Sequence, residues 1–174
     1  MSVQHKILLE LLESSGGGIH RLLARITLRE DVAEELMQEL FIKLSNNKKL
    51  TVIENPAAYA RRTAINLAFD WRRKNRATVN IDNISEPHST VKSPLDKLIG
   101  DEHLNCVLDS IEKLSTEARQ ILVMRSIEQL SYEEIAEQTS KTAHHIRSIL
   151  HRARTKLKDI VKSQITGTSE REAL

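Results

Sequence analysis

Residues that interrupt helices are scarce in this chain of 174 residues, which has three prolines and five glycines. Aromatic residues make up only 3% of the chain, and Leu, Ile, Ala, Glu, Lys and Arg dominate it. This composition favours helices packed through aliphatic side chains over a β-sandwich or barrel. We therefore predict an all-α protein. Three of the glycines are consecutive, at 16–18, and the sequence leaves open whether they break a helix or only loosen it.

The chain has a single cysteine, Cys106, so no intrachain disulfide can form and a reducing compartment is expected. His103 and Cys106 are two potential metal ligands, but two ligands do not make a zinc site, and a packed thiol beside a surface histidine is the favoured interpretation. No apolar run approaches the roughly 20 residues that span a bilayer. Residues 1–15 are amphipathic and contain acids, unlike a signal peptide. We expect a cytoplasmic protein with no membrane insertion, metal or other cofactor.

The net charge is only +2, but it is unevenly distributed along the chain. Residues 1–76 carry 13 basic and 9 acidic groups, residues 101–134 carry 3 and 8, and residues 135–162 carry 7 and 2. Two basic segments separated by an acidic one indicate two nucleic-acid contacts. Charge alone leaves open that the basic helix faces are merely solvated.

Helix starts are well marked and divide the chain into two helical modules. Capping signals predict helices over 28–44, 56–73, 94–113, 115–127 and 132–138, and from 143 onward. The first of these signals is a capping box at Thr27 to Glu30. After the first helix, the capping residues are Asn55 before Pro56, Ser93 before Pro94, Ser115, and Ser131 with Glu134. The stretch from 77 to 93 is polar and non-periodic, as in a linker. We therefore predict module one over 1–76, a linker over 77–93, module two over 94–162 and a flexible tail over 163–174.

The strongest local pattern is a helix-turn-helix between Leu130 and Leu157. A short helix carrying Ile135 and Ala136 inward is followed by a turn, after which Thr142 can cap a second helix. On that helix an apolar stripe recurs at intervals of 4, 3 and 4 residues, and the opposite face is polar and basic. Such a face can lie in the major groove, with Arg154, Lys156 and Lys158 nearer the phosphates. A basic amphipathic helix that only covers a core is the simpler alternative.

Residues 114–154 resemble the carboxy-terminal domain of extracytoplasmic-function (ECF) sigma factors. The resemblance rests on Leu-Ser-Tyr-Glu-Glu-Ile-Ala at 130–136 and Leu-His-Arg-Ala-Arg at 150–154. It implies binding to the promoter's minus-thirty-five element by His144, Arg147, Ser148, His151, Arg152 and Arg154. Where the family usually has Leu-Gly-Ile-Ser at the turn, this chain has Thr-Ser-Lys-Thr at 139–142. Loss of the glycine is expected to strain a left-handed turn residue, which leaves the angle of the second helix open.

The predicted helix over 28–44 has one apolar and one acidic face. Asp31–Glu35 and Glu35–Glu39 are like-charge pairs at i, i+4, each costing about 0.2–0.5 kcal/mol, and an acidic solvated face is one explanation. Ala-Glu-Glu-Leu-Met-Gln-Glu at 33–39 resembles the sigma segment that docks on the clamp of the largest polymerase subunit. The resemblance implies that core RNA polymerase is bound by Asp31, Glu34, Glu35, Gln38 and Glu39.

The helix that begins at Pro56 is basic and carries three of the five aromatic residues. Basic groups for phosphates and platforms for unstacked bases are what holding an opened DNA strand requires. Residues 55–59 and 64–73 resemble the family's segment for minus-ten recognition and melting, which implies DNA contact by Lys48, Lys49, Arg61, Arg62, Asn66, Trp71, Arg72 and Arg73. Tyr59 and Phe69 are favoured as core residues. For Trp71 the sequence leaves open whether the ring is part of the core or stacks on an unstacked base.

The sequence is therefore identified as a member of the ECF sigma factors, closest in character to the iron-transport branch. The resemblance implies no catalysis, core RNA polymerase and promoter DNA as partners, and an anti-sigma factor as a further partner. A freestanding helix-turn-helix regulator that binds DNA as a dimer is the alternative, and it leaves the acidic helix and the linker without a role. An enzyme is disfavoured because the chain has no Gly-rich phosphate loop, nucleophile elbow or complete metal set.

Overall fold

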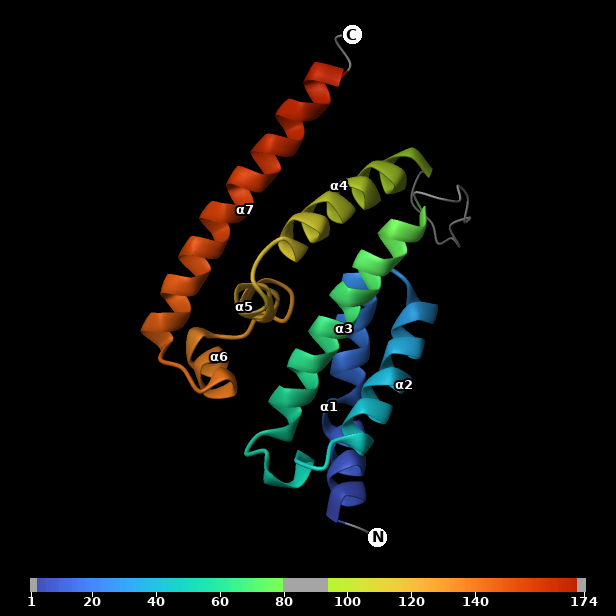
Figure 1. Ribbon diagram of the computed structural model, residues 1–174, viewed down its shortest axis with the longest axis vertical. Helices are drawn as coiled ribbons and strands as arrows, with labels where there is room; N and C mark the ends of the chain where they lie inside the picture. The colour runs from blue at the N-terminus through green and yellow to red at the C-terminus, as the bar shows by residue number, and fades with distance from the viewer. Residues whose placement is uncertain (1–2, 80–93, 172–174) are drawn as a thin grey trace.

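The structure is a computed structural model that describes residues 3–79 and 94–171, with side chains described over 3–76 and 102–163. Within these ranges the chain forms seven α-helices, one short 3₁₀ helix and no strand (Figure 1), which confirms the all-α prediction. The elements are α1 (Val3–Thr27), α2 (Glu30–Asn46), η1 (Leu50–Val52), α3 (Pro56–Val79), α4 (Pro94–Glu112), α5 (Thr116–Ser126), α6 (Tyr132–Thr139) and α7 (Ala143–Arg171).

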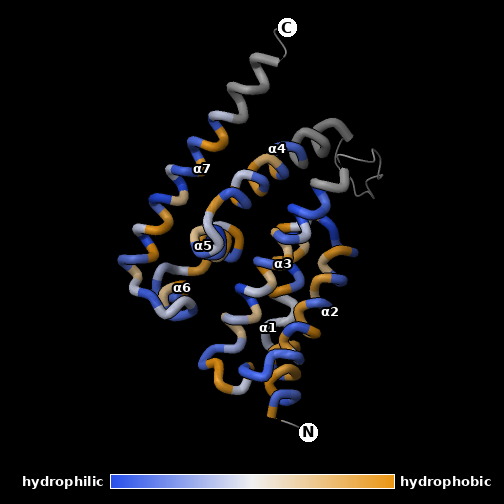
Figure 2. The backbone as a smooth tube through the Cα atoms, in the orientation of Figure 1, coloured by the Kyte–Doolittle hydropathy of each residue, from blue (hydrophilic) through white to orange (hydrophobic). Residues whose placement is uncertain are grey.

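Module one is a bundle in which α1, α2 and α3 pack against one another along their lengths (Figure 1). Along each helix, apolar residues recur among polar ones (Figure 2), so that one side of each can face its neighbours. The fully buried side chains include Leu23 and Ile26 of α1, Leu40 of α2, and Ile65 and Phe69 of α3. The prediction that Phe69 belongs to the core is confirmed.

The three consecutive glycines lie inside α1, which runs through them without a break. Gly16 is buried, and a Cβ there would lie 3.2 Å from Leu12 Cδ1, whereas Gly18 has open space around its Cα. Each glycine lowers helix propensity by about 1 kcal/mol relative to alanine. Packing of α1 against α2 and α3 compensates, because most helical stability in proteins comes from tertiary burial.

The predicted capping box at Thr27 to Glu30 is wrong. Thr27 is the last residue of α1, where its buried hydroxyl donates to Leu23 O (2.9 Å) and accepts from the backbone N–H of Arg29 (3.3 Å). The N-cap of α2 is Arg29, which makes no side-chain cap, and Leu28 adopts a left-handed conformation with φ of 61°. Burial of Thr27 at the end of one helix thus prevents it from capping the next.

The other capping predictions that lie within the described side chains are confirmed. A side-chain oxygen accepts from a backbone N–H three residues later at Asn55, Ser115, Ser131 and Thr142. At Ser131 the capping box is complete, since Glu134 also accepts from the Ser131 N–H at 2.7 Å. That hydrogen bond lowers the pKa of the Glu134 carboxyl.

Module two is built from α4 to α7, with α5 and α6 packed against α7 (Figure 1). The predicted stripe on α7 is buried at Ile146, Leu150 and Ala153, and Leu157 is half-buried. Ile135 and Ala136 of α6 are buried opposite it, as the helix-turn-helix pattern predicts. Buried apolar residues of both modules form one continuous cluster, so the modules are packed together.

Helices α3 and α7 continue past two of the predicted module boundaries. Residues 77–79, predicted as the start of the linker, are helical in α3, and the rest of the predicted linker, 80–93, lies outside the described residues. Residues 163–171, expected to be a flexible tail, continue α7 as helix. Helical hydrogen bonds are local, so a helix can extend past the point where its side chains have a core to bury against.

Candidate nucleic-acid interface

The acidic residues of α2 lie together on its solvent side. Asp31, Glu34, Glu35, Gln38 and Glu39 are all exposed, while Ala33, Leu36 and Leu40 on the other side are buried. Arg29 pairs with Asp31 and lowers the pKa of that carboxyl, and Lys43 pairs with Glu39 at 3.2 Å. Glu34 and Glu35 keep the centre of this face negative. The structure thus brings the five predicted polymerase-binding residues onto one surface.

The segment between α2 and α3 presents two cations beside η1. Lys48 and Lys49 are exposed, and the Lys49 N–H donates to Asn47 Oδ1 at 3.0 Å. The Asn47 amide donates to the Tyr59 hydroxyl at 3.3 Å, which ties the segment to the first turn of α3. These lysines therefore lie at the same end of the bundle as the amino-terminal half of α3.

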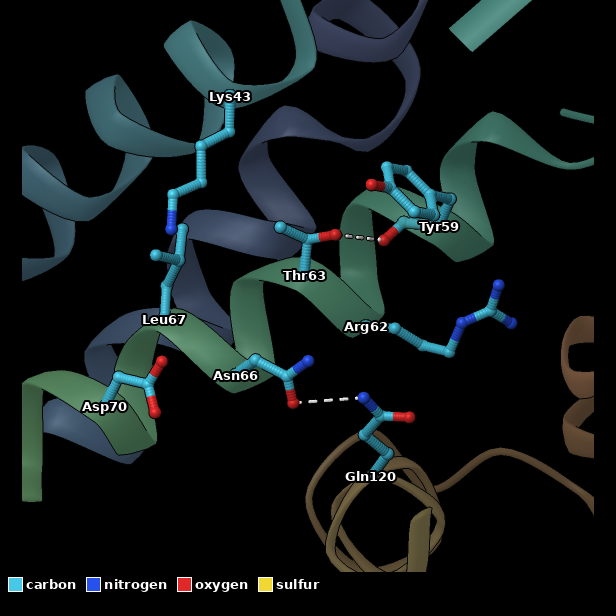
Figure 3. Close-up of a pocket in the computed structure, with 8 residues that line it drawn as sticks. All are labelled: Lys43, Tyr59, Arg62, Thr63, Asn66, Leu67, Asp70 and Gln120. Atoms are coloured by element: carbon cyan, nitrogen blue, oxygen red, sulfur yellow. Dashed lines mark hydrogen bonds between the residues drawn. The ribbon is translucent and has the colours of Figure 1, made fainter. Parts of the chain in front are cut away.

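An open pocket of about 470 Å³ lies against α3, between α2 and α5 (Figure 3). Asn66, which interrupts the apolar pattern of α3, accepts a hydrogen bond there from the Gln120 amide of α5 at 3.0 Å. Half-buried Tyr59 lines the pocket at its other end and is not a full core residue. The lining residues are Lys43, Tyr59, Arg62, Thr63, Asn66, Leu67, Asp70 and Gln120.

Two arginines at the start of α3 contact module two. Arg61 Nε lies 2.8 Å from Glu128 Oε1, and Arg61 Nη1 donates to Gln138 Oε1 at 2.8 Å. Arg62 Nη1 donates to the backbone carbonyl of Gln138. Burial raises the pKa of the Glu128 carboxyl, while Arg61 beside it acts in the opposite direction.

Arg72 lies where it cannot reach DNA in this arrangement. Its side chain is 7% exposed, and its guanidinium donates to Ile26 O of α1 (3.2 Å) and to Asp109 Oδ1 of α4 (2.6 Å). The neighbouring Arg73 is exposed and pairs with Asp70 of its own helix at 2.7 Å. Trp71 is half-buried and packs against the core. The predicted minus-ten residues are therefore split between solvent and the contact with module two.

The predicted recognition face of α7 is open to solvent. All six predicted residues, His144, Arg147, Ser148, His151, Arg152 and Arg154, are exposed. At 100° per residue, Ser148 lies opposite the buried stripe, Arg147 and Arg154 lie on one flank, and Arg152 lies on the other. Arg147 also stacks over the Tyr132 ring, 5.0 Å from its centroid, and lies 3.4 Å from Glu133. This face has the shape and charge of a helix that enters the major groove.

The turn between α6 and α7 is strained as its sequence predicts. Ser140, which stands where the family usually has glycine, is left-handed with φ of 54° and ψ of 40°. Lys141 pairs with Glu117 of α5 at 2.7 Å, which lowers the pKa of that carboxyl. This ion pair joins the turn to α5 where the family has an apolar residue.

We expect Ser140→Gly to raise the free energy of unfolding by about 1 kcal/mol, because glycine adopts the left-handed conformation without the Cβ clash. The greater freedom of glycine in the unfolded chain keeps the gain small. Urea denaturation followed by circular dichroism measures it. Ser148→Gly, in the interior of α7, should instead lower the free energy of unfolding by about 0.5 kcal/mol. An equal change in the free energy of unfolding of both variants would show that Ser140 is not strained.

The residues of module two that meet α3 were not predicted from the sequence pattern. They are Asn105, Asp109, Gln120, Glu128 and Gln138, together with Glu112, which pairs with Arg76. Arg119 was not predicted either; it is a buried arginine whose guanidinium lies 5.1 Å from the centroid of the Phe69 ring and whose pKa is lowered by burial. The acidic character of residues 101–134 was the available signal, because that segment supplies all three of the carboxylates.

The single thiol and its histidine neighbour both lie on α4. His103 is exposed and Cys106 is half-buried on α4. Among the described residues, no group of three or more His, Cys, Asp or Glu side chains could hold a metal ion. No helix within the described part of the chain is both long and apolar enough to cross a membrane.

Comparison with known families identifies both modules. Residues 11–78 match the model of sigma-70 region 2, and residues 104–157 match the model of sigma-70 region 4. The two matches fall on module one and module two in that order. The chain therefore belongs to the sigma-70 family, with a region 2 bundle followed by a region 4 helix-turn-helix.

Similar proteins support the ECF group within that family. The ECF RNA polymerase sigma factor SigE of Mycolicibacterium smegmatis is 26% identical over 165 residues, which cover 92% of this chain and 64% of SigE. The RNA polymerase sigma-E factor of Streptomyces coelicolor is 30% identical over 105 residues, 59% of this chain and 55% of that protein. The chain thus spans less than two thirds of the length of either relative. The iron-transport branch is not confirmed by these relatives.

A solved structure shares the fold. The structure of CnrH in complex with the cytosolic domain of CnrY matches with a TM-score of 0.50 and 16% identity, covering 91% of this chain and 90% of that one. At this level of identity the likeness concerns the fold alone.

Proposed function

We propose that this protein is an ECF sigma factor that directs promoter-specific initiation by core RNA polymerase and catalyses no reaction itself. The observation that carries the proposal is the division of surfaces between the two modules. Module one has an acidic face on α2 and a basic helix α3, and module two has an exposed recognition helix. A single-site regulator would need only the last of these.

Each surface has a distinct physical task. The acidic face of α2 would seat module one on the polymerase, where complementary charge sets orientation and association rate. Exposed side chains of α7 would read base edges in an intact major groove. Lys48, Lys49 and the polar face of α3 would hold the opened strand, and their contacts must offset the few kcal/mol that unstacking each base step costs.

Partners and compartment follow from the same proposal. They are core RNA polymerase and promoter DNA in the cytoplasm, with an anti-sigma factor as a further protein partner. CnrH, which shares the fold of this protein, was solved in complex with the cytosolic domain of a second protein, CnrY. Purification of the protein from its own cells, with identification of what accompanies it, tests for an anti-sigma factor. The iron-transport assignment remains a prediction.

Run-off transcription with purified core polymerase and fragments of the source genome tests the proposal. We expect discrete products that start at a shared pair of sequence elements and that depend on the added protein. The absence of any promoter-specific product would reject the sigma function. Binding to a palindromic duplex as a dimer without polymerase would instead favour the freestanding regulator.

A further inference from the structure

The first turn of α1 holds the segment that joins α2 to α3. We call residues 47–53 the strand-contact segment, because the proposed function assigns its lysines to the opened strand. α1 packs against η1, which lies in this segment (Figure 1). The half-buried side-chain amide of Gln4 donates to the backbone carbonyls of Leu44 (3.3 Å) and Ser45 (2.7 Å) near the end of α2. It also donates to the carbonyl of Asn47 at 3.3 Å.

These carbonyls lie where an α-helix needs donors from outside. The last four carbonyls of a helix have no partner within it, and a left-handed glycine often closes the helix end. The C-cap of α2 is instead Asn47, with φ of −81° and ψ of 97°, and its N–H donates to Leu44 O at 3.2 Å. Gln4 supplies the remaining donor from another helix. The direction in which the chain leaves α2 therefore depends on Gln4.

Asn47 carries this restraint into the strand-contact segment. Its carbonyl accepts from the Leu50 N–H at 3.0 Å, and its side-chain oxygen accepts from the Lys49 N–H at 3.0 Å. Its side-chain amide donates to the Tyr59 hydroxyl at 3.3 Å. Leu50 is fully buried. The segment is thus anchored to all three helices of module one.

The side chains that this anchored segment presents to solvent are suited to a DNA strand. Lys48, Lys49, Thr51 and Val52 are exposed, and Val52 is 77% exposed although it is apolar. Cations bind phosphates, a hydroxyl can hydrogen-bond a base edge, and an apolar side chain can lie against an unstacked base. A segment already held in one geometry loses less conformational entropy when it binds.

We propose that Gln4 and Asn47 are positioning residues that fix the strand-contact segment for recognition of bases in the opened strand. The proposal rests on the proposed sigma function. Gln4 acts through Asn47, because its amide is bound to the carbonyls at the end of α2. Without that amide the segment samples other conformations, and only a fraction of the molecules holds the geometry that favours the correct base.

The experiment compares Gln4→Met, Gln4→Lys and Ser14→Ala in the full-length protein. Methionine has about the length of glutamine but no donor, whereas a lysine ammonium can donate to the same carbonyls. Ser14→Ala is the matched control, because the exposed Ser14 hydroxyl donates to a carbonyl of its own helix, Glu10 O, at 2.6 Å. Base preference is measured by transcription with saturating core polymerase from a barcoded promoter library randomised in the minus-ten and minus-thirty-five elements.

We expect Gln4→Met to lower the preference for the best base at one or two adjacent minus-ten positions by about fivefold, the effect of one lost hydrogen bond. Preference in the minus-thirty-five element should not change. Gln4→Lys should restore the minus-ten preference, since added positive charge near phosphates strengthens binding to all bases alike. An equal loss in both elements, an unchanged minus-ten preference, or the same loss in Ser14→Ala would overturn the proposal.

Hydrogen exchange in the free protein separates positioning from a general loss of stability. Gln4→Met should speed exchange of the hydrogen-bonded amides within residues 47–53 and leave exchange in α5 to α7 unchanged. Faster exchange throughout the chain would contradict a positioning role.

A second variant tests the other anchor of Asn47. Tyr59→Phe removes the acceptor of the Asn47 amide and keeps the ring, so it should lower minus-ten preference in the same direction as Gln4→Met. The transcription assay also separates the two proposals. Product with unchanged base preference in Gln4→Met rejects only the positioning role, whereas no product from the unmodified protein rejects the sigma function.

Discussion

Glu35→Lys is expected to weaken binding to core RNA polymerase by at least about tenfold while making the isolated protein more stable. Glu35 is exposed at the centre of the acidic face of α2, with Asp31 and Glu39 one turn away on either side. The substitution turns the like-charge pairs that Glu35 forms with Asp31 and Glu39 into opposite-charge pairs. Each new pair should stabilise the helix by a few tenths of a kcal/mol. At a basic docking surface the same change creates a like-charge contact, which costs several kcal/mol when solvent is excluded.

The opposite signs of these two effects are what make the variant informative. Interferometry with immobilised core polymerase measures the affinity, and thermal unfolding by circular dichroism measures the stability. Glu10→Lys on α1 is the matched control, because Glu10 is also exposed in module one and lies outside the acidic face. If both reversals reduce affinity equally, the face has no specific docking role and only net charge matters.

Arg152→Ala is expected to reduce binding to the upstream promoter element by about 1–3 kcal/mol and to relax base preference at one position. Arg152 is exposed on α7, and its guanidinium Nε donates to Ser148 O of its own helix at 3.4 Å, its one hydrogen-bond partner among the described residues. Its removal therefore leaves no buried group without a partner. Arg147 is a less clean test because it also stacks over Tyr132 and approaches Glu133.

The control for Arg152→Ala is Arg154→Ala, on the opposite flank of the recognition face. A residue that contacts phosphate carries no sequence information, so its loss should weaken binding to all sequences alike. It should also reduce the slope of log affinity against log salt concentration by about one unit. Selection of binding sites from a random duplex library, at two salt concentrations, separates the two behaviours. Unchanged base preference in Arg152→Ala would remove Arg152 from the reading role.

The amino-acid sequence alone determined the parts of this protein that depend on neighbours along the chain. The caps at Asn55, Ser115 and Ser131, the buried stripe of α7 and the exposed acidic face of α2 all follow from spacing within one helix. The strained turn at Ser140 followed from the missing glycine, because backbone sterics act within a single residue. Local rules suffice for such features.

Tertiary structure alone decided the features that depend on which segments meet. Thr27 fails as a cap because it is buried at the end of α1, and glycines 16–18 stay helical because α1 packs along the bundle. Arg72, basic and next to Arg73 in sequence, is buried against Asp109 while Arg73 is exposed. Charge along a chain shows how many arginines there are, but an arginine is free for DNA only if the fold places no carboxylate against it.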